Sequence, residues 1–406
     1  MGDEDMQICC YDNCTGCGAC ANLCPRGCIE IKPDKYGELH PVVNEDKCVS
    51  CKICVANCPA NKKLIFNEPI KVYASWRRNN AKMKDSASGG VGAALAEKWI
   101  KQGGIVFGTE FDDSFRAIVR REDNLKGIEA FKGSKYVQSY VGESYNEVKE
   151  LLKQGKKVLF FGTPCQIAGL YTVVDRNTVD LTTVEILCHG VSSNEYLQEQ
   201  LRYIEKKIHG EKYDNLTFRT NRWMMDFYFG LWDNDKIVFS QQAYENEYFR
   251  GFLTGLTLRE SCYQCKYKNK ERLGDILIGG FIGFGKHIPF NEPHSRPSLI
   301  FVMNSKGMNL IESAQQELVM VERTLEEALI DGRSLKEPFP RHKKQKVFRQ
   351  IYEKKGFIDA IHESVGDEIR GCKKANRKMH MKRNIKMLLY KTLGIRIQGG
   401  KIYRGN

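Results

Sequence analysis

The run Cys14-x2-Cys17-x2-Cys20-x3-Cys24-Pro25 decides the fold of the N-terminal region, and it recurs as Cys48-x2-Cys51-x2-Cys54-x3-Cys58-Pro59. Three cysteines separated by two residues, and a fourth followed by proline, are typical of loops that bind a cubane iron–sulfur cluster. In paired runs of this kind the fourth cysteine binds the other cluster. We therefore expect two 4Fe-4S clusters. One is bound by Cys14, Cys17, Cys20 and Cys58, and the other by Cys48, Cys51, Cys54 and Cys24.

A disulfide framework and a pair of zinc sites are the alternatives for these cysteines. Zinc sites are typically built from two CxxC-like pairs, and zinc coordination does not require a doubled CxxCxxCxxxCP run. The iron–sulfur interpretation is therefore preferred. Cys9, Cys10 and Cys28 lie outside the two ligand sets. We interpret them as small packing residues, because both clusters already have four ligands.

Length and composition indicate a protein of two or three domains. The chain has 406 residues, of which 42% are hydrophobic, and it contains no run of the roughly 18 apolar residues that a membrane helix needs. The acidic N-terminus MGDEDMQICC lacks the apolar segment of a signal peptide. Sixteen cysteines without an export signal favour metal-bound thiolates in a reducing cytoplasm.

The positive charge is concentrated at the C-terminus. Residues 370–406 contain 12 Lys/Arg and no Asp/Glu, so the rest of the chain has a net charge of only +1 although the total is +13. This basic tail has a helical pattern with Met, Ile and Leu between the charges. Contact with an anionic membrane surface, contact with RNA and a solvated helix packed on the body all remain open. Specific nucleic-acid binding is not expected.

The order of predicted elements gives an α+β, multi-domain fold class. We expect a ferredoxin-like domain over 1–68, with short strands at 29–31 and 64–66. A larger α/β domain over 69–320 follows, with a mixed sheet built from strand–turn–helix units and an antiparallel insertion over 216–242. Residues 321–369 are expected to form a helical C-terminal piece, followed by the basic tail over 370–406.

A serine- and glycine-rich segment precedes the first helix of the larger domain. Ser86, Ser88, Gly89 and Gly90 come just before a helix predicted from 92 to 100. Free backbone N–H groups at the positive end of a helix bind phosphate well. An ordinary serine cap followed by a tight glycine turn explains the same residues equally well.

Four further cysteines predict a third metal site. Cys165 and Cys188 follow successive predicted strands, and Cys262 and Cys265 form a CxxC pair. Carboxyl ends of parallel strands meet at one edge of a sheet, where ligand sites form. Four thiolates suit either zinc or a cubane cluster. The two upstream clusters favour a cluster, with unligated or redox-active thiols as a further alternative.

Several short motifs together resemble the beta-subunit family of coenzyme F420 hydrogenases and dehydrogenases, in the bacterial form with a fused ferredoxin module. The resemblance covers roughly residues 10–320. The motifs are Ser88-Gly89-Gly90, Gly133-Ser134-Lys135-Tyr136-Val137-Gln138-Ser139, Gly162-Thr163-Pro164-Cys165-Gln166, Cys188-His189-Gly190 and Cys262-x2-Cys265.

The resemblance implies bound FAD and a family cluster. It places Ser86, Ser88, Gly89, Gly90, Ser134, Lys135 and Tyr136 at the flavin, and it makes Cys165, Cys188, Cys262 and Cys265 ligands of a third 4Fe-4S cluster. Relatives usually carry an Asp-Phe-Trp-Gly-like segment where this chain has Gly280-Phe281-Ile282-Gly283, which leaves the substrate open. Lys135 and His189 are the candidate catalytic residues. Lys135 would hold negative charge, and His189 would donate protons or simply be a packed imidazole.

We therefore expect a cytoplasmic, FAD- and iron–sulfur-dependent oxidoreductase. It would pass electrons between ferredoxin-type clusters, FAD and a small molecule such as F420, with a redox protein such as a ferredoxin or reductase as partner. The alternative is a non-catalytic electron-transfer subunit that docks its clusters to a partner enzyme. Peripheral attachment to the inner face of the membrane would follow if the basic tail binds lipid.

Overall fold

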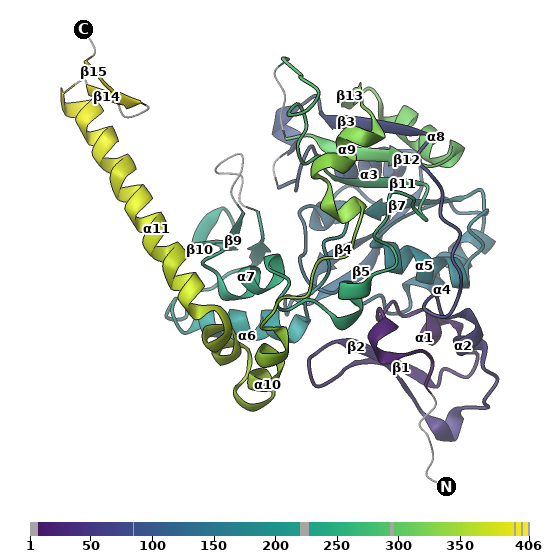
Figure 1. The fold of residues 1–406 in the computed structure, drawn as a ribbon. Helices are drawn as coiled ribbons and strands as arrows, with labels where there is room; N and C mark the ends of the chain where they lie inside the picture. The colour runs from purple at the N-terminus through teal and green to yellow at the C-terminus, as the bar shows by residue number, and fades with distance from the viewer. Residues whose placement is uncertain are drawn as a thin grey trace.

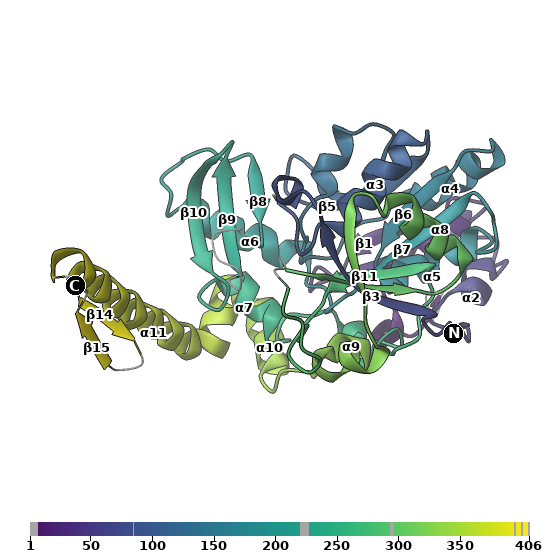
Figure 2. The same ribbon diagram turned by 90° about the horizontal axis from the view of Figure 1, so that it is seen from above.

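The computed structural model describes residues 7–404 except 84, 220–226, 293–295, 394 and 399–400. Its centre is an eight-stranded sheet of order β13-β3-β12-β11-β7-β6-β4-β5 (Figures 1 and 2). The strands are β3 (Lys71–Arg77), β4 (Ile105–Phe111), β5 (Ala117–Glu122), β6 (Val158–Gly162), β7 (Leu181–Ile186), β11 (Ile276–Gly280), β12 (Ser298–Val302) and β13 (Leu318–Glu322). Strands β11, β7, β6 and β4 are parallel, and the outer strands pair antiparallel. The predicted mixed sheet is confirmed.

Both faces of this sheet are covered by helices, which explains its continuous apolar strands. Adjacent residues such as Val106 and Phe107 of β4 point to opposite faces and belong to different core clusters. Helices α3 and α8 cover one face, and α4 and α5 cover the other. The helices are α3 (Val91–Lys101), α4 (Ser144–Lys153), α5 (Pro164–Val173), α6 (Asn194–Glu205), α7 (Glu247–Leu253) and α8 (Ser305–Ala314).

The N-terminal module lies beside the lower edge of the larger domain in Figure 1. It contains α1 (Ala19–Leu23), α2 (Ile53–Asn57) and the antiparallel pair β1 (Ile29–Pro33) and β2 (Leu39–Val43). The expected strand at 64–66 is wrong, because β1 pairs with β2 instead. Asp34 explains this pairing: its side chain accepts hydrogen bonds from the backbone N–H of Tyr36 (2.9 Å) and Glu38 (2.8 Å), which reverses the chain at once.

The predicted antiparallel insertion forms its own three-stranded sheet of order β10-β9-β8. Its strands are β8 (Asn215–Thr217), β9 (Tyr228–Asp233) and β10 (Lys236–Gln242). Phe229 and Leu231 of β9 are fully buried against α6 and α7. The described residues also include the 3₁₀ helices η1 (Tyr11–Asn13), η2 (Glu45–Lys47), η3 (Asn80–Met83), η4 (Gly127–Phe131), η5 (Glu260–Gln264) and η6 (Arg333–Leu335).

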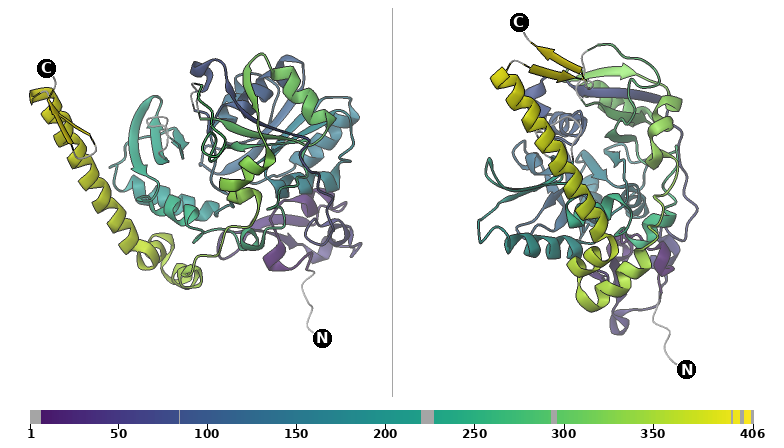
Figure 3. Two further views of the ribbon diagram at one scale, coloured as in Figure 1. Left: turned by 45° about the horizontal axis from the view of Figure 1, so that its top comes forward. Right: turned by 60° about the vertical axis from the view of Figure 1, so that its left-hand side comes forward.

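Two of the expected domain boundaries are wrong. The boundary at 320 falls inside β13, which pairs with β3 and belongs to the main sheet. The boundary at 369 falls inside α11 (Phe357–Leu393), a long helix with a kink at Val365. Beyond the kink α11 still contacts the body as far as Asn376, whose Nδ2 donates to Glu245 (2.6 Å). Its C-terminal part then extends away as an arm that carries a terminal hairpin (Figures 1 and 3). The remaining C-terminal elements are α9 (Leu325–Asp331), α10 (Gln345–Lys355), β14 (Ile395–Gln398) and β15 (Lys401–Arg404).

Within the described ranges, no helix combines the length and apolar character needed to cross a bilayer.

Buried charged groups fix the N-terminal module to the rest of the protein. The Glu38 carboxylate, 3% exposed, accepts a hydrogen bond from the backbone N–H of Glu260 and forms an ion pair with Arg349 of α10. The buried Arg259 side chain donates from Nε to the carbonyl oxygen of Cys14 (2.9 Å) and from Nη1 to Gln138 Oε1 (3.1 Å). Because the Glu38 charge is paired and the Arg259 guanidinium is hydrogen-bonded on burial, the module is held in one position against the body.

Candidate functional site

The two cysteine runs of the N-terminal module surround two small cavities. The cluster I cavity is lined by Cys14, Cys17, Cys20 and Cys58 among others. The cluster II cavity is lined by Cys24, Cys48, Cys51 and Cys54 among others. In each run the residue two positions before the third cysteine, Gly18 or Lys52, has a positive φ, which turns the chain around the cavity. Each predicted ligand set is therefore brought together around one cavity, with its fourth member contributed by the other run.

The four cysteines of the expected third site also lie near one another. Cys165 is in the first turn of α5, Cys188 follows β7, and Cys262 and Cys265 lie in and just after η5. Burial, and then the charges of the neighbouring Cys188, Cys265 and Cys165 thiolates, raise the pKa of Cys262. Burial and the Cys188 charge likewise raise the pKa of Cys265 to about 11. Among the described residues no three His, Cys, Asp or Glu side chains are arranged to hold a single metal ion, and the ligand role of these four thiols stays a prediction.

Two buried cations hold the CxxC loop against β7. The Lys268 ammonium donates to the carbonyl oxygen of Cys188. Arg272 pairs with Glu185 of β7, and both side chains are 1% exposed. The Glu185 carboxylate also accepts hydrogen bonds from the backbone N–H groups of Leu273 and Gly274, each 3.2 Å long. These contacts fix the CxxC pair relative to Cys188.

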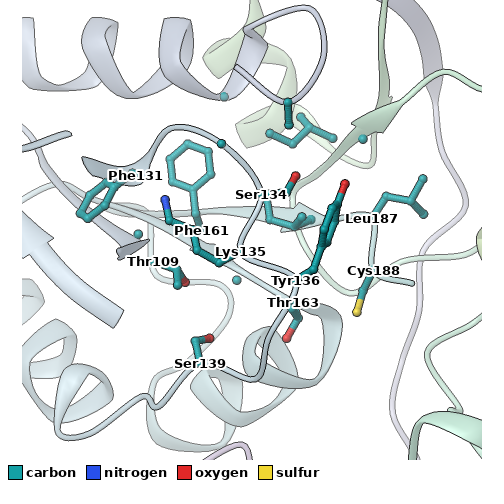
Figure 4. A pocket seen from close by; sticks show the side chains of 18 of the residues that line it. Thr109, Phe131, Ser134, Lys135, Tyr136, Ser139, Phe161, Thr163, Leu187 and Cys188 are labelled. Atoms are coloured by element: carbon teal, nitrogen blue, oxygen red, sulfur yellow. The ribbon is translucent and has the colours of Figure 1, made fainter. Parts of the chain in front are cut away.

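A main cavity of about 320 Å³ lies at the carboxyl ends of the parallel strands. It is lined by Gly108 and Thr109 of β4, Gly162 at the end of β6, Leu187 after β7 and Gly280 of β11. Figure 4 shows Ser134, Lys135 and Tyr136 on one side and Leu187 and Cys188 on the other. The size is typical of a ligand pocket. This position is also where ligands bind in open α/β sheets.

The N-terminus of α3 opens into the main cavity. Its N-cap residue is Gly90, with φ 75°, and no side chain caps the helix. Ser86, Ser88 and Gly90 line the cavity. Ser86 is 6% exposed, and among the described residues its hydroxyl has no hydrogen-bond partner. A buried hydroxyl without a partner beside an uncapped helix N-terminus fits an anionic ligand such as a phosphate.

Gly89 has a different role from its neighbours, because it is not among the residues that line the main cavity. Its backbone N–H donates to Ser298 Oγ (3.0 Å), and Ser298 Oγ is also 2.8 Å from Ser88 Oγ. A Cβ at Gly89 would lie 2.4 Å from the carbonyl oxygen of Ser75 in β3. Gly89 therefore lets the turn approach the sheet closely.

Lys135 and Tyr136 contribute a cation and an aromatic face to the main cavity. The Lys135 ammonium donates to the carbonyl oxygens of Ala130 (2.7 Å) and Lys132 (2.8 Å). Burial lowers the pKa of Lys135 to about 7. The Tyr136 ring stacks on Phe252 with centroids 4.9 Å apart. Lys135 is thus poised between its charged and neutral forms near neutral pH.

The structure adds a cavity residue that sequence reasoning missed. Arg219 lies beyond β8 in the chain. Its guanidinium donates from Nε to Tyr136 Oη (2.7 Å) and from Nη1 to the carbonyl oxygen of Ala87 (2.5 Å). It links the insertion to both cavity loops, and no local motif marked it. Thr163 and Gln166, which also line the cavity, form a capping box at α5. The Thr-x-x-Gln spacing in the sequence could have identified Thr163 and Gln166 as this capping box.

His189 is packed rather than poised for proton transfer. Its ring lies 4.3 Å from Phe339 and 4.9 Å from Phe252, measured between centroids. Burial, with the charge of Lys268, lowers the pKa of His189 to about 4. The imidazole is therefore neutral at pH 7, and the packing interpretation is favoured over proton donation.

The Gly280-Phe281-Ile282-Gly283 segment leaves room at the cavity. A Cβ at Gly280 would meet no atom within 4 Å, so this position is open. Ile282 is 62% exposed. Asp275 is structural, since its carboxylate accepts from Thr183 and from Asn304 Nδ2 (2.8 Å).

Comparisons with known proteins agree with this arrangement. Residues 155–328 match the family described as the C terminus of the coenzyme F420 hydrogenase/dehydrogenase beta subunit, and residues 13–62 match the 4Fe-4S dicluster domain. A subunit of the F(420)H(2) dehydrogenase of Methanosarcina mazei is 24% identical over 178 residues, which cover 41% of this chain and 50% of that one. A ferredoxin of Methanothermococcus thermolithotrophicus is 42% identical over 53 residues, covering 13% of this chain and 82% of the ferredoxin.

Among solved structures, a chain of the F420-reducing NiFe hydrogenase complex from Methanosarcina barkeri has 14% identity and a TM-score of 0.45, covering 74% of this chain and 93% of that chain. The chain spans half the length of the M. mazei protein. The family match starts before β6 and extends into α9, so it includes all four cysteines of the third set and three of the parallel strands. Residues 155–328 therefore form a C-terminal domain of the coenzyme F420 hydrogenase/dehydrogenase beta-subunit family, and residues 13–62 form a 4Fe-4S dicluster domain.

Proposed function

We propose that this protein is an iron–sulfur flavoprotein oxidoreductase that passes electrons between three 4Fe-4S clusters, FAD and a small organic substrate. One observation carries the proposal: the main cavity extends from the open N-terminus of α3 to cysteines of two different cluster sets. Cys17 of cluster I and Cys165 and Cys188 of the third set all line this cavity. A redox cofactor bound there would lie beside ligand cysteines of cluster I and of the third cluster.

FAD fits the residues of the cavity. Its pyrophosphate would lie at the N-terminus of α3, where the Ser86 hydroxyl and the helix N–H groups lack side-chain partners among the described residues. The aromatic ring of Tyr136 and the ammonium of Lys135 would face other parts of the cofactor. Bound flavin supplies the exchange between two-electron and one-electron transfer. Ser88 and Ser134 complete the expected contacts, and Gly89 supports the turn from behind.

The 4Fe-4S dicluster domain favours a cluster over zinc at the third cysteine set, because a third cluster would extend the electron route. Four thiolates also suit a tetrahedral zinc ion, so analysis of iron, zinc and acid-labile sulfide distinguishes the two.

A packed region between cluster I and the third set supports a direct electron route. A Cβ at Gly169 of α5 would lie 3.2 Å from Cys17 Sγ, so α5 and the cluster I loop are in contact. Tyr145 and Tyr267 are at most 2% exposed. Burial and the charges of both Cys17 and Cys165 raise the pKa of each tyrosine, which places the two rings near both sets. Cluster I is then the proximal cluster.

Cluster II is then the distal cluster, and its ligand Cys51 is exposed. A redox partner protein would exchange electrons at this end. The M. mazei relative is one subunit of an F(420)H(2) dehydrogenase, and a partner protein in a complex is the corresponding proposal for this chain. Because the name of that relative includes F(420)H(2), F420 is a candidate substrate of this chain. The open position at Gly280 leaves room for another small molecule.

Anaerobic reconstitution of the full chain tests the proposal. We expect about one FAD per chain and about twelve irons with matching acid-labile sulfide. The variant Cys262→Ala/Cys265→Ala should lower the iron content to about eight. Cys372→Ala is the matched control and should keep all of the iron, because Cys372 lies in α11, outside the three cysteine sets. A screen of oxidants and reductants that bleach or restore the flavin spectrum would then identify the substrate.

The absence of flavin after reconstitution would refute the flavoprotein proposal and leave a non-catalytic electron-transfer subunit. Eight irons in the unaltered protein would refute the third cluster alone.

A further inference from the structure

Each cluster cavity of the N-terminal module is lined by five cysteines, one more than a cubane cluster needs. Cys9 lines the cluster I cavity together with its four expected ligands. Cys28 lines the cluster II cavity in the same way. A cubane has four irons and takes four protein thiolates. One cysteine in each cavity is therefore left over.

Cys28 is in contact with a ligand of cluster II. Its Sγ lies 3.2 Å from Cys24 Sγ, and its side chain is 4% exposed. The backbone carbonyl of Cys28 accepts a hydrogen bond from the N–H of Asn44 (2.7 Å), just before β1 begins. This bond fixes the backbone of Cys28 beside the cavity. Its sulfur is therefore held next to the position that Cys24 Sγ occupies.

Cys9 has the same relation to cluster I. Its side chain lines the cluster I cavity together with Cys14 and Cys58. The preceding residue, Ile8, is 4% exposed, and its carbonyl oxygen accepts from Asn61 Nδ2 (2.9 Å). The extra thiol is thus held against the cavity by a buried neighbour and a backbone anchor.

The two extra cysteines share one further property. Cys28 touches Cys24, and Cys9 lines the same cavity as Cys58. Cys24 and Cys58 are each the fourth cysteine of a run, which binds the cluster of the other run. The fourth ligand is the one not carried by the loop that supplies the first three. Both extra thiols therefore lie near a ligand that reaches its cluster only when the two cysteine runs pack together correctly.

We propose that Cys28 and Cys9 are reserve ligands, which bind the same iron when Cys24 or Cys58, respectively, is removed from it. In the exchange, the Fe–S bond to Cys24 breaks and one to Cys28 forms. The proton of the Cys28 thiol passes to the departing Cys24 thiolate, and no electron is gained or lost. Cluster II is thereby retained although one of its ligands is lost. This inference rests on the dicluster domain alone and does not depend on the flavin.

Alanine variants of the full chain, reconstituted anaerobically, test the proposal without an activity assay. Alanine is used because serine oxygen can itself bind iron. Cys24→Ala and Cys28→Ala should each keep the iron and sulfide content of the unaltered protein, whereas Cys24→Ala/Cys28→Ala should lose about four irons. Cys54→Ala is the matched control. It should lose about four irons by itself, because Cys54, also buried, has no spare thiol assigned to it.

Electron paramagnetic resonance of the reduced protein adds a positive signature. Cluster II in Cys24→Ala should keep its intensity but shift its g values, since a different cysteine is bound, while Cys28→Ala should match the unaltered spectrum. Loss of cluster II in Cys24→Ala to the extent seen in Cys54→Ala would overturn the proposal, and so would its retention in the double variant. Cys58→Ala with and without Cys9→Ala repeats the test at cluster I.

Discussion

Replacing Ser86 by alanine should stabilise the flavin-free protein and at the same time weaken its affinity for FAD. The Ser86 side chain is 6% exposed, and its hydroxyl has no hydrogen-bond partner within the described structure. A buried polar group without a partner costs about 1–3 kcal/mol. Ser86→Ala removes that cost, so the free energy of unfolding of the apoprotein should rise by about 1 kcal/mol.

Flavin affinity should move in the opposite direction. A hydrogen bond to a charged phosphate contributes about 1.5–3 kcal/mol, and its loss raises the Kd for FAD roughly 10- to 150-fold. The assays are thermal unfolding of the apoprotein followed by circular dichroism, and titration of FAD followed by its fluorescence.

Two serines provide matched controls. Ser364 is 2% exposed and its hydroxyl likewise has no described partner, but it lies in α11 and does not line the main cavity. Ser364→Ala should stabilise the apoprotein and leave the Kd for FAD unchanged. Ser88→Ala should instead destabilise the apoprotein, because the Ser88 hydroxyl bonds to Ser298 (2.8 Å). An unchanged Kd in Ser86→Ala, or a destabilised apoprotein, would refute the assignment of this hydroxyl to the phosphate.

Three further variants test other parts of the site. Gly169→Ala places a Cβ 2.9 Å from Tyr145 Oη and 3.2 Å from Cys17 Sγ. Overpacking should lower the free energy of unfolding by about 1–3 kcal/mol, measured by urea titration, and an unchanged midpoint would contradict this close packing of α5. Gly89→Ala places a Cβ 2.4 Å from the Ser75 carbonyl oxygen, so the turn must move and FAD binding measured by equilibrium dialysis should fall at least tenfold. Lys135, with a pKa of about 7, loses its charge as pH rises. FAD affinity should therefore fall roughly tenfold from pH 6 to pH 8. Lys135→Arg stays charged, so its FAD affinity should not change over this range. The same pH dependence in both proteins would show that Lys135 does not contribute its charge to FAD binding.

The parts of the fold that depend on local pattern could be predicted from the sequence. The strand–turn–helix units from β6 to α6 have apolar strands followed by amphipathic helices, so their order and direction were evident. The carboxyl edge of these strands then brought Cys165 and Cys188 together. The spacing within the cysteine runs likewise predicted which cysteines bind each cluster, because the geometry of a cluster requires that spacing.

Contacts between distant segments left no local signal. Strand β3 precedes α3 in the chain but pairs with β12 and β13, more than 200 residues later. No pattern in the chain therefore indicated that the main sheet extends beyond 320. Arg219 belongs to the insertion, and only the packing of that insertion brings it to Tyr136. The low pKa of His189 also depends on burial by Phe252 and Phe339, which come from separate segments.

The ion pair between Glu38 and Arg349 has a consequence for how the protein is made. The two residues are 311 positions apart, so a growing chain exposes Glu38 long before its partner leaves the ribosome. Until then the carboxylate that the finished protein buries lacks its guanidinium partner. We therefore expect the N-terminal module to dock only weakly and to stay accessible to cluster assembly proteins during most of translation. Docking is complete only when α10 packs its Phe348 on Tyr196 of α6 and brings Arg349 to Glu38.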